Sequence, residues 1–276
     1  MSSYDIAFYE RAGQSQKLAA QIISAEVLKI FPHITSAVDI GCGPGGWLAA
    51  LKQLGVKTLL GVDGPWVPNE SLLIQPSIFV THDFQESFPS LQRYDLAISL
   101  EVAEHIFPER AEAFVDFLTT TSDIILFSAA IPMQGGTNHY NEQWPSYWIN
   151  LFRKHNFSFV DILRWKFWGH ANMPVWYKQN LFLVVAQKII TDNKYIQLHD
   201  VNTKNDIFDV VHPELYVLRR ISAKNYISDL ENKIATIKNN YIEELSIRFL
   251  CKSILKKCIA KITGYFKVLR HKSSKP

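Results

Sequence analysis

The chain has 276 residues, of which 47% are hydrophobic, 13% aromatic and 20% charged. That length can bury one full α/β core and leaves material for an appendage. Positive charge gathers at the end of the chain, where residues 246–276 hold nine Lys and Arg and no Asp or Glu, against a formal net charge of only +3 for the whole. Residues 1–245 are therefore mildly acidic, which argues against a nucleic-acid-binding surface on the main part of the chain.

The cysteines and the hydropathy of the chain indicate the compartment in which the protein works. Cys42, Cys251 and Cys258 have neither metal-ligand spacing nor the density of a disulfide framework. The first residues do not read as a secretory signal, and no run of 18 apolar residues occurs. We therefore expect a cytoplasmic protein without a membrane-spanning helix.

Residues 1–35 are predicted to form an N-terminal helical lid. Apolar side chains recur at a helical period from Leu18 to Ile30, and Phe31-Pro32 ends the helix. Tyr4, Phe8 and Tyr9 precede this period and could close over a ligand.

A glycine-rich turn follows the first predicted strand, Ala37–Ile40, and leads into a helix that begins at Trp47. Backbone N–H groups at such a turn face a ligand, and glycine lets the ligand come close. Asp39 would repel a pyrophosphate but suits a ligand with an amino group, such as S-adenosylmethionine. The candidate cofactor-binding residues here are Asp39, Gly41, Cys42, Gly43, Gly45, Gly46 and Trp47.

Two further acids end successive predicted strands. Asp63, followed by Gly64, lies about 20 residues past the glycines, where a ribose diol would bind. Asp83 and Phe84 end the third strand, and Leu100 ends the fourth. The alternative is a doubly wound domain that binds NAD or another ligand.

With these motifs, residues 36–190 resemble the class I S-adenosylmethionine-dependent methyltransferases. The resemblance implies that the glycine loop holds the methionine part, that Asp63 binds the ribose, and that Asp83 with Phe84 meets the adenine. Alternating elements predict a Rossmann-like, doubly wound, mostly parallel seven-stranded sheet with helices on both faces. Its last strand, by the resemblance, is antiparallel. The later elements are predicted as a helix opened by Pro108, a strand at 123–128, a helix at 141–155 and strands at 157–163 and 181–187.

Glu101, Glu104 and His105 follow the fourth strand and are the candidate catalytic residues, together with His139. Spacings of three and four would place the first three on one face of a helical turn. The segment resembles that of ubiquinone-biosynthesis O-methyltransferases and small-RNA 3′-end 2′-O-methyltransferases, which implies a site for Mg²⁺ or Mn²⁺ formed by Glu101, Glu104, His105 and His139. Alternatively, a histidine acts as a general base without metal, or these side chains only hold the loop.

The acceptor is predicted to be a sugar or glycan hydroxyl. Aromatic and polar side chains alternate in 135–148 and 165–180, which suits a sugar ring. Both stretches resemble methyltransferases associated with bacterial surface-polysaccharide and sugar biosynthesis. The alternatives are 2′-O-methylation of RNA 3′ ends, O-methylation of another small hydroxyl compound, and a scaffold without enzyme activity.

After a predicted linker at 191–211, residues 212–276 form a helical extension. Ile227, Leu230, Ile234, Ile237 and Tyr241 are spaced as a short heptad seam, so 215–245 could form a homodimer. Residues 246–270 read as a basic amphipathic helix for an acidic partner or the inner face of a membrane.

Overall fold

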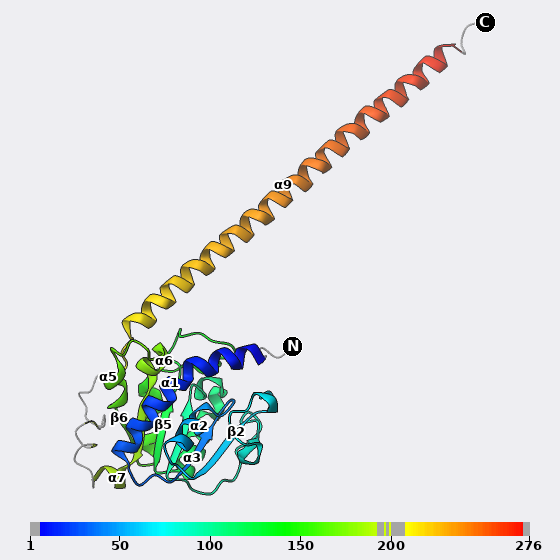
Figure 1. The fold of residues 1–276 in the computed structure, drawn as a ribbon. Coiled ribbons are helices and arrows are strands. Elements are labelled where there is room, and N and C mark those ends of the chain that lie inside the picture. Colours follow the sequence, from blue (N-terminus) through cyan, green and yellow to red (C-terminus); the bar gives the residue numbers. More distant parts are fainter. Residues whose placement is uncertain (1–5, 192–195, 197–198, 200–207, 273–276) are drawn as a thin grey trace. The chain divides into compact units, whose positions relative to one another are not determined.

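The computed structural model describes residues 6–191, 196, 199 and 208–272. It divides into two compact units, one extending to Arg219 and the other beginning at Arg220 (Figure 1). The side chains described begin at Lys17 and end at Gly264. Tyr4, Phe8 and Tyr9 lie outside them, so their closing over a ligand stays a prediction.

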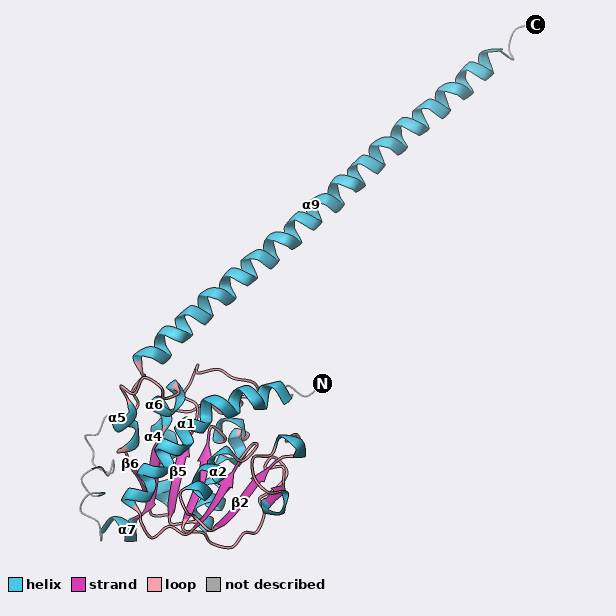
Figure 2. Ribbon diagram, viewed as in Figure 1, coloured by secondary structure: helices cyan, strands magenta, loops and turns pink. Residues whose placement is uncertain are grey.

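A seven-stranded sheet forms the first unit, in the order β3-β2-β1-β4-β5-β7-β6 (Figure 2). β7 runs antiparallel to both of its neighbours, and all other pairings are parallel. The predicted fold class, including the antiparallel last strand, is confirmed. The strands are β1 (Ser36–Ile40), β2 (Thr58–Asp63), β3 (Phe79–Thr81), β4 (Leu96–Leu100), β5 (Ile124–Ser128), β6 (Phe157–Val160) and β7 (Phe182–Ala186).

Helices cover both faces of this sheet because neighbouring strand residues point to opposite sides. Ile98 packs in the cluster that contains α1 and α2, whereas Ala97 packs in the cluster that contains α3 and α4. The helices of this unit are α1 (Ile6–Ile30), α2 (Gly46–Gln53), α3 (Ala111–Thr121), α4 (Pro145–Lys154), α5 (Leu163–Phe167), α6 (Val175–Asn180) and α7 (Gln187–Thr191). Four 3-10 turns join them: η1 (Asn69–Ser71), η2 (Pro76–Ile78), η3 (Ala103–His105) and η4 (Pro108–Arg110).

Three element boundaries differ from the prediction by several residues. The third strand, expected to end at Asp83 and Phe84, ends at Thr81. The helix expected from residue 141 begins at Pro145, because the backbone N–H of Asn141 instead donates to the carbonyl oxygen of Glu104 at 3.0 Å. The strand expected to reach residue 163 ends at Val160. There the N–H of Asp161 leaves the sheet and donates to the carbonyl oxygen of His199 at 3.0 Å.

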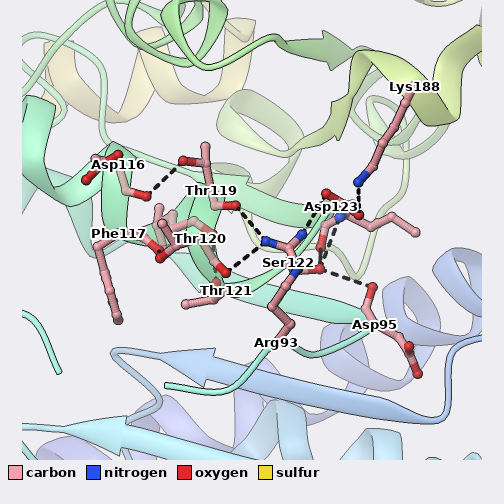
Figure 3. Close-up of polar contacts among 12 residues, drawn as sticks. Arg93, Asp95, Asp116, Phe117, Thr119, Thr120, Thr121, Ser122, Asp123 and Lys188 are labelled. Atoms are coloured by element: carbon pink, nitrogen blue, oxygen red, sulfur yellow. Dashed lines mark hydrogen bonds and ion pairs between the residues drawn. The ribbon is translucent and has the colours of Figure 1, made fainter. Parts of the chain in front are cut away.

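The amino ends of the central parallel strands are tied together by ion pairs (Figure 3). Asp123, just before β5, pairs with Arg93 at 2.6 Å and with Lys188 of α7 at 2.7 Å. Ser122 donates to the carbonyl oxygen of Asp95, just before β4, at 3.1 Å. Asp123 and Arg93 at this edge are already paired with each other, so the loops at the opposite edge, where the parallel strands end, are the better candidates for function.

The second unit lies within one helix, α9 (Pro213–Lys272), which begins in the first unit. Leu215 is buried against Ile131 and Val175, whereas nearly every residue from Tyr216 to Gly264 is exposed. The boundary between the units therefore falls a few residues beyond the predicted end of the linker. Among the described residues, no helix combines the length and the apolar character that crossing a membrane requires.

Candidate active site

The glycine loop leaves β1 through residues with positive φ angles. Gly41 has a φ of +79°, and a Cβ on it would lie 2.4 Å from a methyl carbon of Val102. Gly45 has a φ of +86° and caps the N-terminus of α2. Gly43 has a φ of +51°, but a Cβ there would meet nothing within 4 Å. The loop is thus packed at Gly41 and open at Gly43, where a ligand can approach the backbone.

Asp63 joins the glycine loop to the end of β2. Its carboxylate accepts 2.6 Å hydrogen bonds from the N–H groups of Gly43 and Gly64. Burial raises the pKa of Asp63, and these two hydrogen bonds oppose the shift. The structure thus places three of the predicted cofactor residues in direct contact.

Asp39 is a buried acid beneath the same loop. Its side chain is 2% exposed, and its Oδ2 atom has no hydrogen-bond partner in the part of the chain that the structure describes. Burial raises the pKa of Asp39 well above its ordinary value, and the nearby charge of Asp63 adds to the shift. An unpartnered acceptor of this kind suits the ammonium group of a ligand.

The other residues of the predicted cofactor set lie around this loop. Burial raises the pKa of the Cys42 thiol, and the nearby charges of Asp39 and Asp63 add to the shift. Trp47 is buried edge-on to Tyr177, with ring centroids 5.4 Å apart. Gly46 begins α2, and Leu100 is half-buried at the end of β4.

Asp83 and Phe84 do not end β3 as predicted but follow it by two and three residues, in different surroundings. Oδ1 of Asp83 accepts a 2.8 Å hydrogen bond from the N–H of Gln85. Phe84 is buried, and its ring packs against those of Phe114 and Phe117 in the core. Their contact with an adenine stays a prediction.

Glu101 adopts a left-handed conformation, with a φ of +56°. It precedes the turn η3, so the expectation that it shares one helical face with Glu104 and His105 is wrong. Its Oε2 accepts from Nε2 of Gln134 at 2.8 Å, and its Oε1 accepts from Nδ2 of Asn180 at 3.1 Å. Burial raises the pKa of Glu101, and these amide donors oppose the shift. Gln134 lies in the loop after β5, where no sequence pattern marks it as a site residue.

Glu104, His105 and His139 come together as predicted. One carboxylate oxygen of Glu104 and one ring nitrogen of each histidine lie within 4.8 Å of one another. The two imidazole rings are edge-to-face, with centroids 4.9 Å apart. Glu101 is not part of this group, so the structure assembles three of the four predicted metal ligands.

Each histidine of the cluster is also held by a hydrogen bond at its Nδ1 atom. Nδ1 of His105 lies 3.1 Å from the carbonyl oxygen of Asn138, to which it can only donate. Nδ1 of His139 lies 2.9 Å from Oε1 of Glu142, which also accepts from the N–H of Gly135 at 2.5 Å. With Nδ1 donating, Nε2 of each ring carries the lone pair. Histidines held in this way are typical of metal ligands and of general bases.

Glu104 is fully buried, and neither carboxylate oxygen has a hydrogen-bond partner among the described residues. Burial raises the pKa of Glu104 well above its ordinary value, and the nearby charge of Glu101 adds to the shift. The peptide groups of Glu104 and Ala130 oppose this shift, although neither donates a hydrogen bond of ordinary geometry to the carboxylate. Burial also lowers the pKa of His105, and His139 adds to that shift. A buried carboxylate beside two imidazole nitrogens can be satisfied by a cation between them, either a proton or a metal ion.

The aromatic stretches expected to line the acceptor site divide into core and surface. Trp148 and Tyr177 are buried in the core. Tyr140 is 51% exposed and packs against the half-exposed Phe107, with ring centroids 4.9 Å apart. Tyr140 follows His139 directly, and Phe107 lies two residues after His105, so this exposed ring pair borders the histidine cluster.

This fold and site define a methyltransferase of class I, dependent on S-adenosylmethionine. Residues 11–161 match the family model described as "Methyltransferase domain", which is more than half of the chain, so the chain belongs to that family. The enzyme class predicted from the sequence is therefore confirmed.

Solved structures with a similar fold include magnesium protoporphyrin IX methyltransferase from Synechocystis PCC 6803 with bound S-adenosylmethionine. It is 20% identical, with a TM-score of 0.47, covering 67% of this chain and 86% of that one. An O-methyltransferase family protein from Burkholderia thailandensis is 12% identical, with a TM-score of 0.48 and coverages of 67% and 61%. The methyltransferase domain of a bacterial Hen1 protein is 19% identical, with a TM-score of 0.46 and coverages of 62% and 98%. The sequence matches no curated protein.

Proposed function

We propose that this methyltransferase transfers the methyl group of S-adenosylmethionine to a hydroxyl oxygen of a sugar, in glycan or nucleotide-sugar biosynthesis. The observation that carries the proposal is the cluster of Glu104, His105 and His139. Glu104 and His105 follow β4, which pairs with β1 beside the glycine loop, and His139 lies in the loop after β5. Val102 connects the glycine loop to the histidine cluster, because its side chain packs on Gly41 and it lies two residues before Glu104. The methyl donor and the group that activates the acceptor thus share one edge of the sheet.

The cofactor would lie over the open side of the glycine loop. Asp39 offers its unpartnered oxygen to the ammonium group of the methionine part. Asp63 still has acceptor capacity for the ribose hydroxyls, because each of its oxygens accepts a single peptide N–H in the structure. Asp83 and Phe84 remain the proposed contacts of the adenine.

The cluster fits a divalent metal ion. Glu104 supplies a buried carboxylate without a partner, and each histidine has its Nδ1 occupied, as expected for a metal ligand. Mg²⁺ or Mn²⁺ held by Glu104, His105 and His139 would lower the pKa of an acceptor hydroxyl and orient it. Glu101 takes part only if its carboxylate leaves Gln134 or Asn180, so its role as a fourth ligand is the weaker part of the proposal.

General-base catalysis is the second candidate for the same step, and the state of His105 favours it. A histidine with a lowered pKa is neutral near pH 7 and can accept the proton of the acceptor hydroxyl. Glu142 would then hold His139 in the matching tautomer, through the contact at Nδ1.

The ring pair of Tyr140 and Phe107 supports a sugar acceptor. Aromatic faces that are half in solvent stack on the C–H face of a sugar ring, while nearby polar groups bind its hydroxyls. Both rings lie beside histidines of the cluster in the sequence, so a stacked sugar would present a hydroxyl to them.

The test begins with isothermal titration of S-adenosylhomocysteine into the wild type, Asp63→Ala and Glu112→Ala, the last being a surface acid far from the loop. Binding is expected to be lost only in Asp63→Ala. Methyl transfer from labelled cofactor is then measured to sugars, nucleotide sugars and a short RNA with a free 3′ end, with EDTA and with added Mn²⁺. Transfer to RNA alone would overturn the sugar acceptor, and transfer that EDTA leaves unchanged would favour the general base.

A further inference from the structure

Exposed apolar side chains continue along α9 well beyond its contacts with the first unit, in two different patterns. From Ile227 to Tyr241 they follow a heptad spacing, which gives a narrow seam suited to a second helix. After Leu245 this spacing is lost. The two patterns call for different partners.

The second pattern is a broad apolar arc. Its members lie at relative positions 0, 3, 7, 8, 12 and 15 of the helix, which at 3.6 residues per turn cover about half of the circumference. Each is at least half exposed, between 53% and 62%. They are Ile247, Leu250, Ile254, Leu255, Ile259 and Ile262.

Basic side chains lie at both ends of this apolar arc and between its members. At 100° per residue, Lys257 and Lys252 lie about 20° beyond its two ends, whereas Lys261 and Arg248 lie inside it. The sequence contains no Asp or Glu from Ser246 to its last residue. Long basic side chains at such positions can reach phosphates while their methylene stems stay on apolar surface.

We propose that residues 246–264 of α9 bind an anionic lipid surface, with the apolar arc inserted between headgroups. Charge complementarity favours this partner over a second copy of the helix, because two such segments side by side would bring like charges together without a continuous heptad seam. A nucleic acid would use the positive charge but not an arc of six aliphatic side chains. This binding is independent of the methyl acceptor.

The experiment is sedimentation of the full chain with vesicles of phosphatidylcholine alone, and of phosphatidylcholine mixed with phosphatidylglycerol, at low and high salt. Binding is expected only to the mixed vesicles and is expected to weaken at high salt. Neutralising Lys252, Lys257 and Lys261 to Gln should lower the partition coefficient roughly 100-fold, at about fivefold per lysine. The matched control neutralises Lys224, Lys233 and Lys238 of the same helix and should change little.

A second variant, Leu250→Gln with Ile254→Gln, tests the apolar arc and should lose binding while the circular dichroism of the helix is kept. Equal sedimentation with both vesicle types, or none with either, would overturn the proposal. So would light scattering that shows a dimer of the wild type and a monomer of this variant, because a second copy would then cover the arc. Displacement of the protein from vesicles by short RNA that binds it more tightly would also overturn it.

Discussion

Asn180 donates a hydrogen bond from its side-chain amide to Oε1 of Glu101 at 3.1 Å, although the two residues are 79 positions apart. Glu101 follows β4, and Asn180 ends α6 just before β7. Because β7 is antiparallel to the central strands, its beginning lies at the edge where those strands end. The reversed strand thus delivers an amide to a buried carboxylate of the site.

We expect Asn180→Ala to lower the free energy of unfolding by about 1.5–3 kcal/mol, the cost of removing a hydrogen bond to a charged group in the interior. Urea unfolding measures this. Gln143→Ala is the control, since the Gln143 amide donates only to a neutral partner, Oδ1 of Asn141, at 3.0 Å. If both variants lose the same free energy of unfolding, the hydrogen bond from Asn180 to Glu101 has no special contribution to stability.

Gly41 and Gly43 offer a matched pair of substitutions, because both have positive φ angles but different surroundings. Gly41→Ala meets Val102 and should cost about 3 kcal/mol or more, from left-handed strain and overpacking together. Gly43→Ala enters open space and should cost only about 1–2 kcal/mol. In calorimetric titration, however, Gly43→Ala should lose S-adenosylhomocysteine binding; if its affinity is unchanged, the cofactor does not lie over Gly43.

Asp39 predicts a specific dependence of stability on pH. Its pKa is raised well above 3.8 by burial, so above that value the folded chain keeps a proton that the unfolded chain has lost. The free energy of unfolding therefore falls as pH rises from about 3.8 through the raised pKa. Asp39→Asn removes this dependence, and unfolding from pH 4 to pH 8 should show the variant gaining on the wild type as pH rises. A constant difference between the two would contradict the buried, unpartnered state.

Glu142→Gln tests whether the histidine cluster binds metal. The change keeps the shape but weakens the hydrogen bond to Nδ1 of His139, and loss of such a contact typically lowers metal affinity 10–100-fold. Titration of Mn²⁺ into the chelator-treated protein measures this. Glu109→Gln, at a surface position of η4, is the control and should bind as the wild type does. If wild type and Glu142→Gln both fail to bind Mn²⁺, the general-base mechanism takes precedence.

Local patterns were sufficient to predict the sheet and the glycine loop, because alternation of apolar residues and runs ended by glycine are properties of short segments. They could not predict the geometry of Glu101. Its spacing from Glu104 is helical, but one left-handed residue at a strand end removes it from that turn. Its partner Gln134 lies in the loop after β5 and its partner Asn180 ends α6, so their meeting depends on the whole sheet. From the sequence alone, Phe84 could equally pack in the core or face a ligand, and the fold is needed to show that its ring packs in the core.

The position of β7 has a consequence for shortened versions of the protein. The matched family region ends at residue 161, but β7 lies between β5 and β6 in the sheet. A chain cut after residue 161 would leave β5 paired on one side only, with β4, and β6 without any partner strand, exposing unpaired peptide groups beside apolar strands. Such edges recruit other chains, so that fragment should aggregate rather than fold, and limited proteolysis should find no stable product that ends there.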